Sequence, residues 1–453
     1  MQIIFLIPFF ISCYLVFNKK ADKAFLNVYL PCLLMCPTYY IVRLPHLWPI
    51  SPASGALMPI GLGMLFAPRT KWRLTRMDLW VLVFMVSIGL SETLREGDPK
   101  AGMLIWIQDF VEMFLVYVVG RQVIEPGLRL ETVKRIILLY VCELPFALYE
   151  YKMGVNPFLR LGATLGVSVG WLVQLRGGHA RIGVVFAHAI LSGIMFVVAI
   201  GLNHYLQYLY KQNKNSLGPK MSWLQKNHVP TLALPGMLFL TGSRMPMACG
   251  VLTYMLMRIP SFKSMRTGVI TMLGIVLIGG GIVYTGYQKY TTLKEGENAT
   301  DEALTSALYR EQLLENYAPV LELGGWLGWG ADSFPRVGGQ ISIDNNYLML
   351  QLMQGKLGRY SFILLGMEAA LTLSLALRRF QSRESQYIAF SIFTALIGVF
   401  VALTTVAMFE QVIQMLFLLL GWSQSLQDTY AFGARAAVPT GAEPKFRFRR
   451  VIA

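Results

Sequence analysis

Residues 287–359 read YQKYTTLKEGENATDEALTSALYREQLLENYAPVLELGGWLGWGADSFPRVGGQISIDNNYLMLQLMQGKLGR and form the only long polar excursion in this chain. The remaining sequence consists of apolar segments of about 17–25 residues, a length that crosses the hydrocarbon core of a bilayer. Of the 453 residues, 55% are hydrophobic and 14% are charged, whereas soluble proteins contain roughly 25% charged residues. We therefore predict an all-α, polytopic membrane protein in which this stretch is a long loop between spans.

The apolar segments predict about 12–13 transmembrane helices. The first segment lacks a basic flank and a small-residue cleavage site, so we do not expect a cleavable signal peptide. The expected spans are 2–17, 24–42, 49–67, 78–94, 101–120, 132–151, 182–209, 229–243, 245–257, 267–286, 360–377, 386–406 and 408–424.

The formal charge of +15 is distributed unevenly between the two sides of the predicted bundle. Alternate connections and the C-terminal tail hold 26 of the 40 Lys and Arg residues, and the short connections on the other side hold 8. This bias is the positive-inside signal of a membrane protein, so we expect no nucleic-acid partner. It predicts a cytoplasmic tail, an outside N-terminus and an outer, periplasmic loop at 287–359. The basic sequence KFRFRR near the C-terminus is suited to contact with anionic membrane lipids.

Two carboxylates within one expected span support a competing class of function. Asp109 and Glu112 lie three residues apart in span 101–120, and intramembrane carboxylates are rare and usually functional. A proton-coupled transporter or flippase would use such a pair. The alternative is structural: one carboxylate pairs with a core arginine and the other lies near a water-filled cavity. We favour the structural interpretation because nothing else in the chain resembles a coupling-ion site, and because we detect no internal repeats of the kind that transporters contain.

Basic residues also gather at the expected outer ends of two spans. Arg176, His179 and Arg181 precede span 182–209, and His188 is expected deeper within that span. A Thr-Gly-Ser-Arg turn joins the spans 229–243 and 245–257, which places Arg244 at the outer surface. Arginine can reach lipid phosphates from this position, and it also presents a rigid fork of donors suited to a phosphate ligand.

The long loop predicts two short helices around a turn. The first helix has a predicted apolar face and ends at Gly324–Gly325, where glycine favours a helix C-terminus. A second helix begins at the polar cluster Asp344–Asn346, where Asp344 or Asn345 is a natural N-cap. Capping accounts for only one of these polar residues. The expected apolar face of the first helix contains Leu304, Ala307, Leu308, Leu314, Tyr317 and Leu321.

Four motifs in residues 180–375 resemble, in order, those of the O-antigen ligase and polysaccharide polymerase superfamily. They cover less than half of the chain, and each motif alone is weakly specific. The motifs are RIGVVFAHAI (181–190), TGSRMPM (241–247), LYREQLLENY with GWLGWGADSF (308–317 and 325–334), and DNNYLMLQLMQGKLG (344–358).

This resemblance implies a membrane-embedded glycosyltransferase that uses a glycan linked to undecaprenyl diphosphate and needs no cofactor or metal. Outer arginines suit such chemistry because the diphosphate leaving group develops negative charge. The catalytic candidates are Arg181, Arg244 and, as general base, Asp344. The candidates for substrate binding are Arg176, His188, Arg310, Asn345 and Tyr347. The five cysteines and five histidines show no disulfide framework or metal-binding spacing.

One departure from the family pattern favours a polymerase over a ligase. Ligases of this superfamily usually carry His-Asn where this chain has Asp344–Asn345, and an Asp here resembles the exopolysaccharide polymerase branch. We therefore expect a polymerase of lipid-linked repeats in the bacterial inner membrane. The alternative is a ligase that transfers finished glycan to lipid A core or to protein. The expected partners are the donor and acceptor lipid-linked oligosaccharides, membrane lipids and other polysaccharide assembly proteins.

The expected organisation has three parts. Residues 1–180 form scaffold helices, residues 181–425 form the ligase-like catalytic region with its outer loop, and residues 426–453 form the basic tail.

Overall fold

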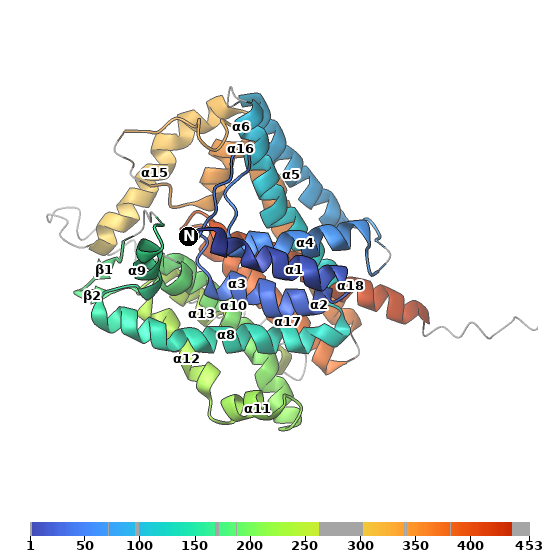
Figure 1. Cartoon of the computed structure of the whole chain (residues 1–453). Helices are drawn as coiled ribbons and strands as arrows, with labels where there is room; N and C mark the ends of the chain where they lie inside the picture. The colour runs from blue at the N-terminus through green and yellow to red at the C-terminus, as the bar shows by residue number, and fades with distance from the viewer. Residues whose placement is uncertain are drawn as a thin grey trace, which may run out of the picture.

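The structure is a computed structural model, and the residues that it describes are almost entirely helical (Figure 1). One two-stranded hairpin is the exception among them. The fold class is therefore all-α, as predicted. The described residues are 2–70, 72–95, 99–167, 172–186, 188–261, 302–338, 340, 342–380 and 382–436.

The first half of the chain forms a layer of mostly apolar helices. Ser51 starts α4 with a capping box, in which its side chain and that of Ser54 each accept from the other's backbone N–H, an arrangement that satisfies free donors at a helix start. The elements are η1 (Gln2–Leu6), α1 (Ile7–Phe17), α2 (Ala21–Ala24), η2 (Phe25–Tyr29), α3 (Leu30–Met35), α4 (Pro52–Phe66), α5 (Arg76–Arg95), α6 (Pro99–Asp109), η3 (Phe110–Leu115), α7 (Val116–Gln122) and α8 (Pro126–Met153).

The second half adds the hairpin, the connecting helices and the longest helix, α16. Gly355 has non-helical backbone angles within α16, so this helix is kinked there. The elements are α9 (Pro157–Thr164), β1 (Leu175–Arg176), β2 (His179–Ala180), η4 (Val184–Phe186), α10 (Ala189–Gln212), α11 (Pro219–Lys226), α12 (Val229–Leu240), α13 (Arg244–Leu256), η5 (Ile259–Ser261), α15 (Glu302–Gly324), α16 (Asn346–Arg379), α17 (Arg383–Ala402) and α18 (Glu410–Ala436).

One apolar core joins both halves of the chain and extends from Ala21 to Leu426. Helices α7 and α18 pack closely, because Gly120 and Gly421 have no side chains to separate the two backbones. A Cβ added to Gly421 would lie 2.1 Å from the Tyr117 carbonyl oxygen. Small residues permit such close approach between membrane helices. The regions expected at 1–180 and 181–425 share this core, since α8 packs against α10 and α12.

Five described helical segments are long and apolar enough to cross a membrane. They support a membrane-embedded protein. The expected span 267–286 and residues 287–301 of the expected outer loop lie outside the described residues, so the count of 12–13 spans remains a prediction. The five segments are Arg76–Leu94, Pro99–Gln122, Ala189–Gln212, Asn346–Leu377 and Arg383–Ala402, and three shorter apolar helices cover Ile3–Phe17, Pro52–Phe66 and Val229–Leu240.

Three sequence expectations about helices need correction. The span expected at 24–42 ends as a helix at Met35, because Cys36 is extended and precedes Pro37, which disfavours helical geometry before it. The span expected from residue 182 becomes helical only at Ala189. The expected apolar face of α15 is misplaced at Leu314, which is exposed, whereas the neighbouring Leu313 is buried in a small separate core.

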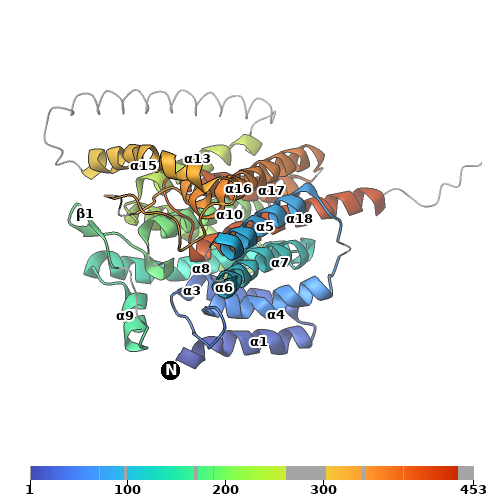
Figure 2. The same ribbon diagram turned by 90° about the horizontal axis from the view of Figure 1, so that it is seen from above.

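The polar elements gather at one end of the bundle. Helices α1 and α4 lie side by side, whereas α5 runs at a steep angle to them (Figure 1). The β1–β2 hairpin, α9 and α15 lie toward the left in both views, and the C-terminal end of α18 lies toward the right (Figures 1 and 2). The left end of this arrangement therefore carries most of the residues predicted to form a functional site.

Candidate functional site

The hairpin places Arg176 next to the Thr-Gly-Ser-Arg turn. Strands β1 and β2 pair antiparallel with Arg176 opposite His179. Gly177 and Gly178 both have positive φ angles in the connection, as the tight two-residue hairpin turn requires. The Arg176 guanidinium donates to the carbonyl oxygen of Gly242 at 2.7 Å.

Arg181 binds the same turn as Arg176 does. Its Nε donates to the Thr241 carbonyl at 3.1 Å, and Nη2 donates to Ser243 Oγ at 2.8 Å. Its Nη1 donates to Gln174 Oε1 at 2.7 Å. The structure thus brings together two motifs that lie 60 residues apart in the chain. Two arginines converge on one turn between α12 and α13.

Arg244 is the first residue of α13, directly after that turn. Its side chain is exposed, unlike that of Arg181, which is partly buried against the turn. A helix N-terminus carries a partial positive charge, so the cation of Arg244 adds to a local field that favours an anion. This placement matches the sequence prediction that Arg244 lies at the end of a span.

A buried carboxylate fixes the backbone between Arg181 and His188. The oxygens of Glu150 accept hydrogen bonds from the backbone N–H of Gly183 at 3.1 Å and of Val184 at 2.8 Å. Asn156 Nδ2 donates to Glu150 at 3.0 Å and to the Val184 carbonyl at 2.8 Å. Val184 has φ +47°, a strained value for a β-branched residue. These contacts explain why the chain here is not α-helical, since backbone groups of Gly183 and Val184 are bonded to the side chains of Glu150 and Asn156 instead.

His188 caps α10 and does not lie within a span, which corrects the expectation from sequence. Its Nδ1 accepts from the backbone N–H of Ile190 at 3.3 Å, and its Nε2 lies 3.4 Å from Gln174 Nε2. Burial, reinforced by the positive charge of Arg181, lowers the pKa of His188 to about 4, while Asp344 acts in the opposite direction. The ring is therefore neutral at pH 7. Arg181 and Asp344 therefore both lie within electrostatic range of His188.

Asn345, and not Asp344, performs the capping role at the start of α16. Its side-chain oxygen accepts from the N–H groups of Tyr347 at 3.0 Å and Leu348 at 3.1 Å. Asp344 is partly buried and accepts a hydrogen bond from Ser342 Oγ at 2.9 Å. Its carboxylate is therefore not required to cap the helix, which leaves it available for another role.

The remaining predicted binding residues lie around this helix start. The Tyr347 hydroxyl donates to the Phe400 carbonyl at 2.8 Å, which joins α16 to α17. Tyr309 of α15 accepts from the N–H of Ser342 at 2.9 Å and donates to its carbonyl at 2.6 Å. Arg310 follows Tyr309 in α15, and its side chain lies outside the described residues. The Tyr-Arg motif is thus attached directly to the Asp344 segment.

The Gly-Trp turn docks onto the kink of α16 through backbone groups. Trp329 N–H donates to the Leu352 carbonyl and Gly330 N–H to the Met353 carbonyl, each at 2.9 Å. Gly328 and Gly355 face each other so closely that a Cβ on Gly355 would lie 2.5 Å from the Gly328 nitrogen. This contact determines where the turn lies relative to the rest of the site.

The turn is also tied to α5. The buried carboxylate of Glu92 accepts from the backbone N–H of Ala331 at 3.0 and 3.2 Å. Sequence reasoning missed both Glu92 and Glu150 as positioning residues. The sequence shows each of these glutamates close to the end of an apolar segment. It does not reveal the backbone groups that they bind, because these groups are far away in the chain.

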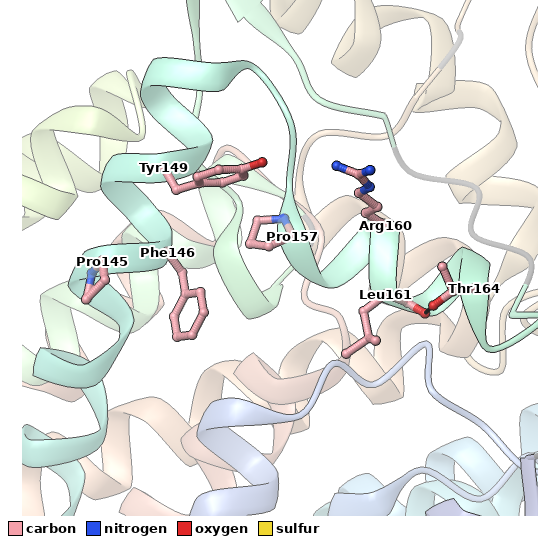
Figure 3. Close-up of a pocket in the computed structure, with 7 residues that line it drawn as sticks. All are labelled: Pro145, Phe146, Tyr149, Pro157, Arg160, Leu161 and Thr164. Carbon is pink, nitrogen blue, oxygen red and sulfur yellow. Dashed lines mark hydrogen bonds between the residues drawn. The ribbon is translucent and has the colours of Figure 1, made fainter.

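Two apolar hollows lie near these elements. One has a volume of about 490 Å³ and lies between α16 and α17, with Tyr347 and Phe400 among its lining residues. The other, of about 530 Å³, lies between α8 and α9 (Figure 3). Pro145, Phe146 and Tyr149 line it from α8, and the Arg160 side chain lies on its α9 side (Figure 3). Both hollows are predominantly apolar in lining and suit a hydrocarbon chain.

The carboxylates of the competing transporter hypothesis lie elsewhere. Asp109 ends α6, and Glu112 lies in the π-helical turn η3. The buried core arginine Arg121 pairs instead with Asp78, and with Asp428 at 2.9 Å. Within the described part of the chain, no group of three His, Cys, Asp or Glu residues is arranged to hold a metal ion.

No protein-family description and no curated protein sequence matches this chain.

Proposed function

We propose that this protein is a membrane glycosyltransferase that polymerises oligosaccharide repeats carried on a polyprenyl diphosphate. The observation that carries the proposal is the meeting of the sequence motifs at one end of the bundle. Arg176 and Arg181 both bind the turn that precedes Arg244. Asp344 lies within electrostatic range of His188 on the same side.

The proposed reaction is a transfer at the anomeric carbon of the donor sugar. A hydroxyl of the acceptor repeat attacks this carbon, and the bond between the carbon and the diphosphate oxygen breaks. Asp344 accepts the proton of the attacking hydroxyl. The polyprenyl diphosphate leaves with the electron pair of the broken bond, and Arg244 and Arg181 stabilise the negative charge that develops on it.

The surroundings of these residues support the division of roles. Arg181 is held by three hydrogen-bond acceptors, so its charge is preorganised and needs little rearrangement. Asp344 is free of the capping role that Asn345 fulfils. His188 is neutral at pH 7 and adds no charge to the arginine pair. The hollow beside Tyr347 would receive part of the isoprenoid chain.

The test is the sizing of lipid-linked glycans from a strain that lacks the protein. Accumulation of single repeats on the outer face supports a polymerase. Long chains on the lipid would instead indicate the ligase, and repeats trapped inside would indicate a flippase. Complementation with Arg181→Ala, Arg244→Ala or Asp344→Asn should leave single repeats, while Arg43→Ala, an exposed arginine outside the site, should restore polymer.

Insertion of each variant must be verified by its amount and elution profile after detergent extraction. If Arg181→Ala and Arg244→Ala both insert normally and make normal polymer, the assignment of a diphosphate site to these residues is wrong. Loss of activity in Asp109→Asn, together with full activity in Asp344→Asn, would favour the transporter.

A further inference from the structure

A polar hollow lies at the opposite end of α10 and α13 from the arginine site. It has a volume of about 340 Å³ and is lined by residues from α10, α11, α12, α13 and α17. Its polar lining includes Lys211 and His204 from the C-terminal half of α10, and Tyr254 and Arg258 from the end of α13. The same helices begin at His188 and Arg244, so the hollow and the arginine site lie toward opposite ends of these helices.

The charge in this hollow is positive. Lys211 and Arg258 both lie within electrostatic range of His204, and no Asp or Glu is among the described residues that line the hollow. The carboxylate of Glu384 on α17 accepts from the Tyr205 hydroxyl at 2.8 Å and lies within range of Arg129. Glu384 and Arg383 both lie within electrostatic range of Tyr208, which lines the hollow, so their opposite charges offset each other there.

The guanidinium of Arg258 is held in place by the neighbouring Tyr254 side chain. Arg258 donates a hydrogen bond to the Tyr254 hydroxyl, and its guanidinium carbon lies 4.8 Å from the centre of the Tyr254 ring. A guanidinium held in this way is oriented before a ligand arrives, which reduces the entropic cost of binding. Lys211 adds a flexible point charge. Together they suit a phosphate group.

Asn203, Gln207, Gln225 and Thr231 add further polar groups to the lining, but apolar side chains also line the hollow, and other apolar side chains of the same helices are exposed. Ile200, Leu234 and Pro235 line it. On the same helices, Leu232 is 71% exposed and Val251 is 55% exposed, which is expected of side chains that face lipid. A ligand with a phosphate head and a hydrocarbon tail fits this combination better than a free anion does.

We propose that this hollow binds an anionic phospholipid, with its phosphate between Lys211 and Arg258 and an acyl chain along Leu234 and Pro235. This site is independent of the glycosyltransferase proposal, because none of its residues belongs to the arginine site at the other end of the helices. The interaction is a specific one with a lipid held in a hollow, and it differs from general attraction of a basic surface to a charged membrane.

The test compares lipid retention by the full-length protein in detergent, measured by native mass spectrometry. Phosphatidylglycerol and phosphatidylcholine with the same acyl chains are added in separate titrations, and inorganic phosphate is added as a competitor. We expect stronger retention of phosphatidylglycerol. The double variant K211Q/R258Q should weaken it by about tenfold or more, on the scale of two basic residues near anionic lipid.

The matched control is K220Q/K226Q, which removes the same charge from α11 at two exposed lysines that do not line the hollow. It should change retention by less than about twofold. Tyr254→Phe keeps the ring and removes the hydroxyl that binds Arg258, so it should give an intermediate loss even if the double variant fails to fold.

Three outcomes would overturn the proposal. The first is equal loss in the two double variants, which would indicate general surface attraction. The second is equal retention of the two lipids by the unaltered protein. The third is displacement of the lipid by millimolar inorganic phosphate, which would indicate a site for a soluble phosphate compound.

Discussion

Replacing Gly355 by alanine should separate the Gly-Trp turn from α16. Gly355 has φ +67° and ψ −165°, a region that is essentially restricted to glycine. An added Cβ would lie 2.4 Å from the carbonyl carbon and oxygen of Trp326. These are backbone atoms, so the contact cannot be relieved by rotation of a side chain. The turn or the helix must move.

The expected cost follows from two contributions. A non-glycine residue in this backbone region costs about 1–3 kcal/mol. The turn is held to the kink by four backbone hydrogen bonds, in which Trp329 and Gly330 donate to α16, and Lys356 and Leu357 donate to the turn. Losing two of them costs about 0.5–1.5 kcal/mol each. We therefore expect a loss of about 2–6 kcal/mol in the free energy of unfolding of this region.

Two assays measure this effect in detergent. Thermal unfolding, followed by the recovery of the folded peak in size-exclusion chromatography, reports the stability of the whole protein. Limited trypsin digestion reports the turn itself, because Arg336 is exposed directly after it. Gly355→Ala should lower the unfolding midpoint and accelerate cleavage after Arg336.

Gly236→Ala is the matched control for this prediction. Gly236 lies in α12 and has no atom within 4 Å of an added Cβ, so alanine there should be neutral or slightly stabilising, by about 0.5–1 kcal/mol. If both variants unfold at the same temperature and are cleaved at the same rate, the close contact between the turn and the kink does not exist in the protein.

Three further perturbations test other parts of the structure. Glu150→Ala leaves two buried backbone N–H groups without their acceptor, so it should lower the free energy of unfolding by about 2–4 kcal/mol, measured by thermal unfolding. The control is Glu143→Gln, at a carboxylate with no hydrogen-bond partner among the described residues, which should lower it by less than about 1 kcal/mol. The pKa of His188 is about 4 in the folded protein and about 6.5 in the unfolded chain, so the free energy of unfolding is unaffected by this group above pH 6.5 and falls by up to about 3 kcal/mol as the pH decreases toward 4. His188→Gln should flatten this part of the curve of stability against pH. An unchanged curve would contradict the lowered pKa of His188. Arg121→Met leaves Asp78 without its buried cation and should lower the free energy of unfolding by about 3–5 kcal/mol. Adding the second substitution Asp78→Asn should restore part of this stability in the same thermal unfolding assay.

The sequence predicted those features of the fold that depend on neighbouring residues. Apolar segment length and charge gave the membrane class and most helix positions, including the short turn between α12 and α13 at Thr241–Ser243. Gly324–Gly325 ends α15 as expected, since Gly325 has a positive φ angle. Asn345 was one of two predicted caps, and local hydrogen-bond geometry selects it.

The sequence could not predict features that depend on distant partners. The start of α10 is shifted to Ala189 because Glu150 and Asn156 bond the backbone at Gly183 and Val184. No periodicity within residues 182–188 reveals this competition. Likewise, the buried face of α15 is set by the small core that it shares with Phe334 and α16.

The sequence by itself thus determined an all-α membrane protein with basic residues near two helix starts, because hydrophobicity, charge and capping are local properties. Only the tertiary structure decided that Arg176 and Arg181 share one turn and that Lys211 and Arg258 line a common hollow. These relationships arise from helix packing, which brings together residues that are separated by tens of positions in the chain.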